Sequence, residues 1–498
     1  MTPAELLLTT YLPMTKYLLI SLSIVAATLV SMSTQGAPSI SQTVTVSKPN
    51  IVLFLVDDMA TADVKYMRTL SRLARAGVRF SRFVAPTPWC APSRASILRG
   101  QYSSNTHQDI DSGFDTFHLL RFEKETIAVW LQRAGYTTGL FGKYINGYME
   151  SELVNTRYVP PGWNEWYGGP QPEGYNFTLN ENGTVVEYKE PGSPHIDDKL
   201  ASLAVDFIDR HYSVPMFLYI ASTSAHSPAV PAHRYEGMFL DVNSVPQSPS
   251  FNEEDVSDKP AYIQKKPKIP ANADERLQLF RNRLRTLLSV EDLIKAVTAA
   301  LTKHSVLNNT YFVFVSDNGW HYGEHRITDA KFTPYEAANI VPAWIWGPGI
   351  PANSSRDYLV ANSDLAQTFA EWAGAQVPSF VDGRSLVPLL RSEPMPISEW
   401  RQALVLSYQE DLYYPFPNVH NPWPPSYIGL LTTAEKYIHY NTSERELYFN
   451  ASDPYEMESQ HENPLWKNKM QKLLLWTRAF GHCRGETCRE LDKAPPAK

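Results

Sequence analysis

Four short runs rich in apolar residues constrain the fold of this 498-residue chain most strongly, because each one ends abruptly in polar or charged residues. The runs are residues 50–56 (NIVLFLV), 137–141 (TTGLF), 216–220 (MFLYI) and 311–315 (YFVFV). A continuous β-favouring run is typical of a strand that is buried on both faces of a mostly parallel sheet. The pattern therefore predicts a large α/β core.

Predicted helices alternate with these strands. A helical repeat of apolar residues covers 63–76 and ends at Gly77, Thr126 can cap a second helix, and residues 284–301 form a third. Alternation of strands and helices with long crossovers predicts a doubly wound α/β fold, in which helices cover both faces of a large, mostly parallel mixed sheet.

The organisation of the chain changes beyond about residue 375, where the alternation weakens. Short strands such as 402–408 and 434–440 predict a smaller antiparallel sheet there. We therefore expect a large α/β domain at 46–375 and a smaller C-terminal α+β domain at 376–498.

Residues 240–275 are polar and rich in proline, which predicts a long surface excursion that rims the site. Its basic cluster, Lys265, Lys266 and Lys268, could attract an anionic polymer, but the composition favours a solvated loop.

Polar residues directly follow the predicted strands, and they form the candidate site. They are Asp57, Asp58, Lys143, His226, Asp317 and Asn318. In open α/β sheets, ligands bind in the crevice outside the carboxyl ends of the strands, so these distant residues are expected to converge. A single acidic pair would more often be turn chemistry. Two such pairs beside a lysine and a histidine favour a binding site.

Cys90 lies in the segment WCAPSRASILRGQY. Pro92 suits the first turn of a helix, which places Cys90 at the helix N-terminus, where unpaired N–H groups attract anions. Arg94, one turn further on, could hold an oxyanion. The alternative is a buried structural cysteine, which is the commonest fate of a free cysteine.

The N-terminus predicts entry into the secretory route. Residues 17–30 are apolar after Lys16, and small residues follow to Ala37, so residues 1–37 fit a cleaved signal peptide; the alternative is an uncleaved anchor. No later stretch is long and apolar enough for stable membrane insertion. The net charge of −7 argues against nucleic acid as the dominant partner.

Six N-x-[ST] sequons support a glycosylated secreted or lysosomal protein; they are Asn176, Asn182, Asn308, Asn353, Asn441 and Asn450.

The chain has three cysteines. In an oxidising compartment Cys483 and Cys488 favour a small disulfide loop, and two thiols alone make a poor zinc site. Cys90 is then the odd cysteine, and chemistry is one explanation for it.

The segment around Cys90 resembles the sulfatase family. Cys90-Ala91-Pro92-Ser93-Arg94, followed by Ile97-Leu98-Arg99-Gly100, matches the family's long C-x-P-S-R-x-x-x-(L/I)-x-G signature. The resemblance spans roughly residues 48 to 490. GKYING at 142–147, HSP at 226–228, LLSVEDL at 287–293 and SDNGWHYGEH at 316–325 look most like the N-acetylglucosamine-6-sulfatase and arylsulfatase branch.

The resemblance implies an alkaline-phosphatase-like fold, in which 46–375 is the catalytic domain, and it implies conversion of Cys90 to formylglycine by a formylglycine-generating enzyme. The hydrated aldehyde would attack the sulfur of a sulfate monoester, and its second hydroxyl would then help to release sulfate.

The resemblance also assigns roles to the other site residues. It implies a divalent cation, Ca²⁺ rather than Mg²⁺. The residue types agree with this, because carboxylates and an amide are hard oxygen ligands that suit Ca²⁺. The implied ligands are Asp57, Asp58, Asp317, Asn318 and modified Cys90. The implied sulfate-binding and proton-donating residues are Arg94, Lys143, His226 and Lys331, with His321 as a further substrate or outer-sphere residue.

One departure from the family stands at Ile145, where many arylsulfatases have a histidine two residues after the lysine of GK. The role of that histidine, which is to assist the second hydroxyl of the hydrated aldehyde, must be vacant or filled by another group such as His226 or Asn146.

We expect hydrolysis of sulfated sugars, such as 6-sulfated glucosamine units, and of aryl sulfates. The alternatives are a phosphonate or phosphate ester hydrolase on the same fold and a non-catalytic sulfoglycan-binding protein.

Overall fold

The computed structural model describes residues 48–108, 113–169, 174–270, 274–409 and 423–496. The predicted signal peptide, residues 1–37, lies outside the described residues. Among the described residues, no helix has both the length and the apolar character needed to cross a bilayer.

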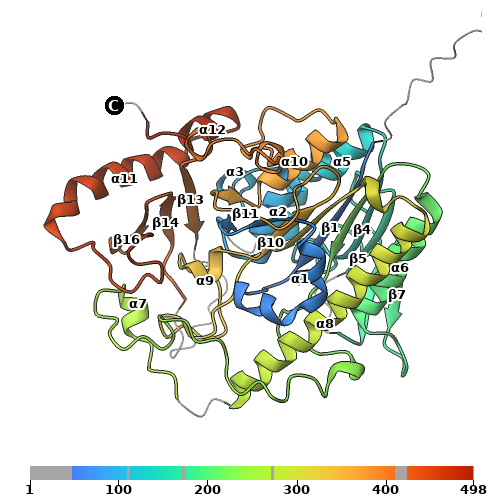
Figure 1. Cartoon of the computed structure of the whole chain (residues 1–498), viewed down its shortest axis with the longest axis horizontal. Coiled ribbons are helices and arrows are strands. Elements are labelled where there is room, and N and C mark those ends of the chain that lie inside the picture. Colours follow the sequence, from blue (N-terminus) through green and yellow to red (C-terminus); the bar gives the residue numbers. More distant parts are fainter. Residues whose placement is uncertain (1–47, 109–112, 170–173, 271–273, 410–422, 497–498) are drawn as a thin grey trace, which may run out of the picture. The chain divides into compact units, whose positions relative to one another are not determined.

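The main sheet has ten strands in the order β11-β2-β10-β9-β1-β8-β4-β5-β6-β7 (Figure 1). Their bounds are β1 Asn50–Val56, β2 Gly77–Phe80, β4 Thr137–Lys143, β5 Glu165–Gly169, β6 Phe177–Glu181, β7 Thr184–Tyr188, β8 Met216–Ala221, β9 Thr310–Ser316, β10 Ala343–Trp346 and β11 Ser354–Arg356. The central strands β9, β1, β8, β4 and β5 are parallel, and antiparallel pairs lie toward both edges. The predicted mostly parallel mixed sheet is confirmed.

Helices cover both faces of this sheet (Figure 1). The helices among the described residues, including those outside these two faces, are α1 Arg68–Ala74, α2 Cys90–Arg99, α3 Ser103–Thr106, α4 Gly113–Leu119, α5 Ile127–Arg133, α6 Ile196–His211, α7 Ala261–Gln264, α8 Asp274–Lys303, α9 Glu336–Asn339, α10 Asp364–Ala373, α11 Lys467–Phe480 and α12 Glu486–Leu491. Short 3-10 turns occupy Thr61–Tyr66, Phe122–Lys124, His233–Tyr235, Leu307–Asn309, Val387–Leu389, Ile397–Glu399 and Pro464–Trp466.

The two faces of β1 explain its unbroken apolar sequence. Ile51, Leu53 and Leu55 enter the core with α2, α5 and α10, while the intervening residues enter the opposite core with α6 and α8. Because successive side chains of a strand point to opposite faces, both sets must be apolar. Every residue of β1 is buried.

The helix predicted at 63–76 is broken in the structure. A 3-10 turn ends at Tyr66, Met67 leaves the helical region with φ −90° and ψ 83°, and α1 follows. Gly77 begins β2 instead of ending a helix. A Cβ at this position would lie only 2.2 Å from the carbonyl oxygen of Ile345 on β10. Close approach of two strands therefore selects this glycine.

A separate antiparallel sheet follows in the C-terminal part, as predicted. It comprises β13 Ala403–Tyr408, β14 Tyr427–Thr432, β15 Glu435–Tyr440 and β16 Arg445–Phe449 in sequential order. Met470 and Leu473 of α11 pack against its apolar face. A short two-stranded pair, β3 Phe83–Val84 with β12 Val360–Ala361, contributes to the same core. The proposed domain boundaries at 46–375 and 376–498 stay a prediction.

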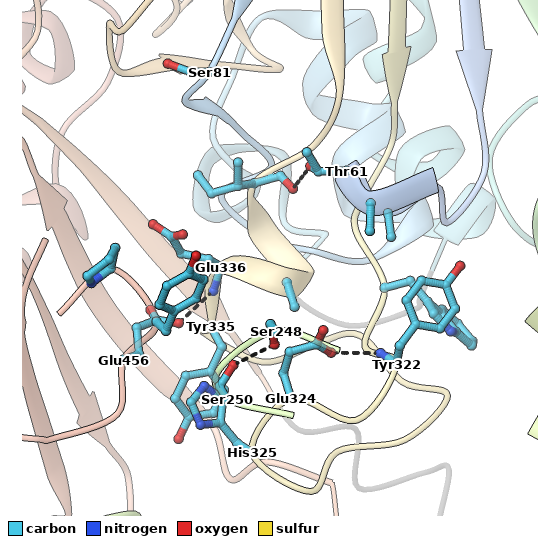
Figure 2. A pocket seen from close by; sticks show the side chains of 17 residues that line it. Thr61, Ser81, Ser248, Ser250, Tyr322, Glu324, His325, Tyr335, Glu336 and Glu456 are labelled. Carbon is cyan, nitrogen blue, oxygen red and sulfur yellow. Dashed lines mark hydrogen bonds between the residues drawn. The ribbon is translucent and has the colours of Figure 1, made fainter. Parts of the chain in front are cut away.

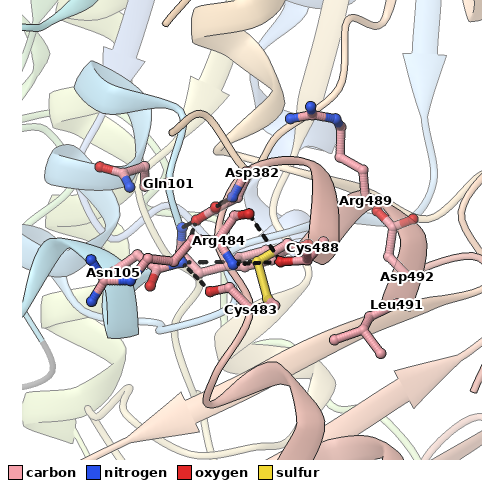
Figure 3. Close-up of a disulfide and its surroundings, with 12 residues drawn as sticks. Gln101, Asn105, Asp382, Cys483, Arg484, Cys488, Arg489, Leu491 and Asp492 are labelled. Carbon is pink, nitrogen blue, oxygen red and sulfur yellow. Dashed lines mark hydrogen bonds between the residues drawn. A yellow bond between two sulfur atoms is a disulfide. The ribbon is translucent and has the colours of Figure 1, made fainter. Parts of the chain in front are cut away.

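A disulfide joins Cys483 and Cys488, and the loop between them is anchored on the α2–α3 region (Figure 3). Asp382 accepts hydrogen bonds from the backbone N–H of Gly485 at 2.6 Å and from Asn105 Nδ2 at 2.8 Å. It also accepts the N–H of Tyr102 at 2.9 Å. The chain end is thereby held against the segment that directly follows the Cys90 helix.

The excursion at 240–275 is less solvated than predicted. Lys265 is exposed, but Lys266 is only 4% exposed, so the three lysines do not form one solvated basic cluster. Local folding explains the difference, because the short helix α7 turns the chain inward at Tyr262 and Ile263, both buried.

The glycosylation sites remain predictions, and their exposure differs. Asn176, Asn182, Asn308, Asn353 and Asn441 are exposed, and Asn450 is half-buried. Its Nδ2 donates a hydrogen bond to the carbonyl oxygen of Thr432 at 3.0 Å. This contact makes Asn450 the least accessible of the six.

Candidate active site

The polar residues that follow the central strands meet at one edge of the sheet. Asp57 and Asp58 follow β1, Lys143 is the last residue of β4, and Asp317 follows β9. Strands β9, β1, β8 and β4 are parallel neighbours, so their carboxyl ends lie side by side. His226 lies in the loop after β8.

Cys90 is the first residue of α2, as the sequence predicts, and it joins this cluster. Its Sγ lies 3.5 Å from Oδ1 of Asp57, and its side chain is 2% exposed. The potential ligand atoms of Asp57, Asp58, Cys90 and His226 all lie within 4.8 Å of one another. The free cysteine is therefore at the centre of the site rather than in a purely apolar core.

Asp57 is surrounded by cations. Lys143 Nζ lies 2.6 Å from its Oδ2, and Arg94 Nη2 lies 3.3 Å from the same oxygen. Burial alone would raise the pKa of Asp57, but the charges of Lys143, His226 and Arg94 outweigh it and hold the pKa well below its ordinary value. Asp57 is thus ionised throughout the physiological range.

Asp58 forms the second half of the acidic pair. Lys331 Nζ contacts its Oδ1, Asn318 Nδ2 donates to the same oxygen at 2.6 Å, and His226 Nε2 lies 3.6 Å from its Oδ2. Its backbone adopts φ 59°, a left-handed conformation that directs the chain away from β1. Arg283 Nη2 donates to its carbonyl oxygen at 2.5 Å and so supports this turn.

The site contains oxygen atoms that suit a hard cation. Asp58 Oδ2 and Asn318 Oδ1 are buried, and among the described residues neither has a hydrogen-bond partner. A buried oxygen without a donor is costly unless something else satisfies it. Carboxylate and amide oxygens are the ligands that Ca²⁺ and Mg²⁺ use, so the residues present fit a divalent cation.

The expected role of Arg94 in holding an oxyanion stays a prediction, and the structure gives its guanidinium three protein partners. Arg94 is fully buried on α2, and its guanidinium bonds Asp317 at 2.8 Å, Asp57 at 3.3 Å and the carbonyl oxygen of Lys143 at 2.9 Å. Burial and the charge of Asp57 raise the pKa of Asp317 to about 6, although Arg94 opposes them. These contacts favour a positioning role for Arg94, which holds the two carboxylates and the Lys143 backbone in register.

Lys331 reaches the site from a distant segment. Its Nζ lies 2.9 Å from Cys90 Sγ and also contacts Asp58, while its side chain is almost completely buried. His321 supports this segment: its Nε2 pairs with Thr333 Oγ1 at 2.7 Å, and its backbone bridges Ala330. His321 itself is fully buried, so a direct substrate contact of this residue stays a prediction.

His226 is the most accessible member of the cluster, with a side-chain exposure of 24%. It lines a cavity of about 150 Å³ together with Thr223, Pro228 and Thr286. Burial lowers the pKa of His226, and the charges of Asp58 and Asp57 oppose that effect. The imidazole therefore faces both the acidic pair and an open space.

A larger cavity of about 300 Å³ lies apart from Cys90 (Figure 2). Glu324, Glu336 and Glu456 line it, and Figure 2 shows Glu336 beside Glu456. Three carboxylates among its lining residues disfavour an anionic ester, although Lys436 pairs with Glu456. Its chemistry argues against a role in binding a negatively charged substrate.

Sequence reasoning missed Arg283, which is fully buried on α8 and bonds the carbonyl oxygens of Asp58 and Ala225. It therefore ties the loop after β1 to the loop after β8. The available signal was its position: Arg283 precedes the run Leu284, Leu287 and Val290 on the buried face of a helix, where a charged residue needs partners.

Fold and site together define an α/β enzyme in which buried cations and carboxylates surround a free cysteine, beside oxygen atoms that suit a divalent metal. The family model "Sulfatase" matches residues 49–375, and "N-sulphoglucosamine sulphohydrolase, C-terminal" matches residues 323–477. The chain belongs to the sulfatase family and is a sulfuric ester hydrolase.

Individual relatives agree with this assignment. N-acetylglucosamine-6-sulfatase of Capra hircus is 30% identical over 89% of this chain and 85% of its own length. The extracellular sulfatase SULF-1 homolog of Drosophila melanogaster is 32% identical over 72% of this chain. The matched region covers only 33% of the length of that relative. A solved protein in complex with its substrate D-glucosamine-2-N,6-O-disulfate shares the fold, with a TM-score of 0.75, 22% identity and coverage of 90% of this chain and 99% of the other.

Proposed function

We propose that this protein hydrolyses sulfate monoesters of sulfated sugars, R–O–SO₃⁻ + H₂O → R–OH + HSO₄⁻, with 6-sulfated glucosamine units as the substrate class. The observation that carries the proposal is the position of Cys90, whose Sγ lies between Lys331 Nζ at 2.9 Å and Asp57 Oδ1 at 3.5 Å. A buried nucleophile next to the Lys331 ammonium, with Asp57 on its other side, suits attack on an anionic ester.

The nucleophile is formylglycine, formed from Cys90 by a formylglycine-generating enzyme during maturation. Its hydrated aldehyde supplies two hydroxyl groups, one to attack sulfur and one to help release sulfate. Burial, together with the charge of Asp57, raises the pKa of the unmodified Cys90 thiol well above its ordinary value. A thiol in that state is a poor nucleophile, which supports the need for conversion.

Asp57, Asp58, Asp317, Asn318 and converted residue 90 would hold a divalent cation, with Ca²⁺ preferred over Mg²⁺. When bound, the cation polarises the sulfate oxygens and favours ionisation of the nucleophile. The unsatisfied Asp58 Oδ2 and Asn318 Oδ1 are the support for this assignment. Lys143 and Lys331, next to the same carboxylates, would bind the remaining charge of the sulfate.

The leaving oxygen receives its proton from a group that faces the cavity beside the cluster. His226 is positioned to protonate the leaving oxygen, because its ring combines contact with Asp58 and partial exposure. Lys331 is the alternative donor. Ile145 itself cannot perform the function of the absent histidine, since it is 2% exposed and packs in the apolar core. His226 and the neighbouring Asn146 are the groups proposed for that function.

The named relatives support a sugar sulfate as substrate, and both a secreted and a lysosomal location fit the N-terminal sequence. The test is a panel of defined sulfated saccharides beside the sulfate and phosphate esters of one phenol, compared by kcat/KM. Higher kcat/KM for the sulfate ester and release of sulfate from a 6-sulfated glucosamine support the proposal. Preference for the phosphate ester would instead indicate a phosphohydrolase, and binding of sulfated sugars without turnover would indicate a binding protein.

A further inference from the structure

Asp197 is a buried acid that the proposed mechanism does not use. It lies in the first turn of α6, and its side chain is completely buried. Building on the proposed function, we propose that Asp197 is a positioning residue of the active site. It fixes the loop after β8 against the backbone of Asp57, and it thereby sets the positions of Asp57 and His226 relative to each other.

Each carboxylate oxygen of Asp197 accepts one serine hydroxyl from this loop. Ser222 Oγ donates to Oδ1 at 2.6 Å, and Ser224 Oγ donates to Oδ2 at 2.8 Å. The N–H of Ser224 donates in turn to Ser222 Oγ at 3.0 Å. One acid on α6 therefore fixes two side chains and one backbone N–H of the loop, and an ionised carboxylate can accept both hydroxyls.

The loop held by Asp197 is hydrogen-bonded to both backbone groups of residue 57. The N–H of Asp57 donates to the carbonyl oxygen of Ser224 at 2.9 Å, and the N–H of Ala225 donates to the carbonyl oxygen of Asp57 at 2.8 Å. Ser224 thus has its side chain on Asp197 and its carbonyl oxygen on Asp57. This residue links the start of α6 to the backbone of the carboxylate next to Cys90.

His226 directly follows the same segment. Its N–H donates to the carbonyl oxygen of Thr223 at 2.9 Å, so its backbone is part of the turn that Asp197 holds. Its Nε2 lies 3.6 Å from Oδ2 of Asp58. Because a small misplacement of reacting groups lowers the rate of reaction strongly, a shift of this loop would impair proton transfer by His226.

The neighbouring Asp198 separates this role from simple stabilisation of α6. Both acids lie in the first turn of the helix, where a negative charge is favourable. Asp198 is partly exposed and pairs with Arg234 at 2.7 Å, whereas Asp197 contacts the loop after β8. Asp198→Asn therefore removes a charge from the same turn and leaves the contacts of the active-site loop in place.

The experiment compares Asp197→Asn with Asp198→Asn by kcat and KM for 4-nitrophenyl sulfate and by Tm. Asparagine keeps the shape of the side chain but replaces one acceptor by a donor. We expect Asp197→Asn to lower kcat roughly 10- to 100-fold and to change KM by no more than about twofold, since the loop is displaced but the cations near Cys90 are kept. Asp198→Asn should retain wild-type values.

Ser224→Ala removes one of the two hydroxyls, and it carries the test if Asp197→Asn does not fold. It should also lower kcat without a matching rise in KM. In the double variant Asp197→Asn/Ser224→Ala, the loss of kcat should be smaller than the product of the two single losses, because both substitutions break the same contact.

Hydrogen exchange gives a readout that does not need turnover. Peptides that cover residues 55–58 and 222–227 should exchange faster in Asp197→Asn and at the wild-type rate in Asp198→Asn, because the N–H groups of Asp57 and Ala225 lose a fixed partner. Unchanged exchange in both peptides, wild-type kcat in both Asp197→Asn and Ser224→Ala, or faster exchange throughout the chain with a lowered Tm would overturn the inference. If the wild type hydrolyses only the phosphate ester, the proposed function fails, and the same ratios measured on that ester still test Asp197.

Discussion

Lys331 places its Nζ 2.9 Å from the Sγ of Cys90, although 241 residues separate them in the sequence. The same ammonium contacts Asp58, so one lysine links the helix that carries Cys90, the proposed nucleophile, to the acidic pair after β1. Loss of this cation should therefore affect chemistry, and it should also lower stability because Asp58 would lose a buried partner.

Replacement of Lys331 by methionine should lower kcat for an aryl sulfate by roughly 10²–10³-fold, the range found when one preorganised charge-stabilising donor is removed. Methionine keeps most of the buried stem. Lys268→Met, which removes an exposed lysine, is the control and should retain wild-type kcat. A Lys331→Met enzyme with wild-type kcat would remove this residue from the sulfate site.

Chelation should reduce both activity and thermal stability, because several buried oxygens would lose a common partner. Treatment with EGTA is expected to abolish turnover and lower Tm, and added Ca²⁺ should restore both. Asp58→Asn should weaken Ca²⁺ binding, so that turnover is reduced and recovers only at higher added Ca²⁺, whereas Asp206→Asn, at a largely exposed acid on α6, should behave as wild type. Full activity after chelation, with no metal detected by mass spectrometry, would contradict the proposed site.

Arg94 is expected to be intolerant of substitution even by another cation. Arg94→Lys cannot bond Asp317, Asp57 and the Lys143 carbonyl together, and breaking a buried ion pair costs about 3–5 kcal/mol. We expect a lower Tm together with reduced kcat. Unfolding monitored by circular dichroism checks this directly, and an unchanged Tm would show that the network contributes little to folding.

The contribution of Glu253 to stability should rise as the pH falls from neutral to mildly acidic. Burial raises the pKa of Glu253 to about 7, although Lys259 opposes this effect. Between its ordinary value near 4.5 and about 7, the folded state keeps a proton that the unfolded state releases, so the free energy of unfolding decreases as the pH rises through this window.

Glu253→Gln should flatten this dependence of Tm on pH, because the amide resembles the protonated acid. The neighbouring Glu254 is exposed, and Glu254→Gln is the control that should keep the wild-type slope. A Glu253→Gln variant with the wild-type slope between pH 4.5 and 7 would show that another group carries the effect.

The strands and the site at their ends could be predicted because both follow from local sequence. A strand buried on two faces has to be apolar throughout, and the polar residue after it falls at the sheet edge, as Asp57 and Asp317 do. The position of Cys90 was also predictable, since Pro92 is compatible with a first helical turn.

What could not be predicted depends on contacts between distant segments. The partners of Arg94 come from three different strand ends, so its burial and positioning role are invisible in its own segment. Lys266 and Lys265 have the same chemistry and adjacent positions, but only the packing of α7 decides which one is buried. The interruption of the helix at Met67 likewise follows from tertiary packing, because its apolar repeat is continuous.

The most direct test of the account is mass spectrometry of the tryptic peptide that contains residue 90, from protein made in cells with a formylglycine-generating enzyme. We predict the mass in which CH₂SH is replaced by CHO, a fraction converted that matches the specific activity toward 4-nitrophenyl sulfate, and no activity in Cys90→Ala protein of wild-type Tm. A peptide that carries only an intact thiol in a preparation with full sulfatase activity would contradict the account.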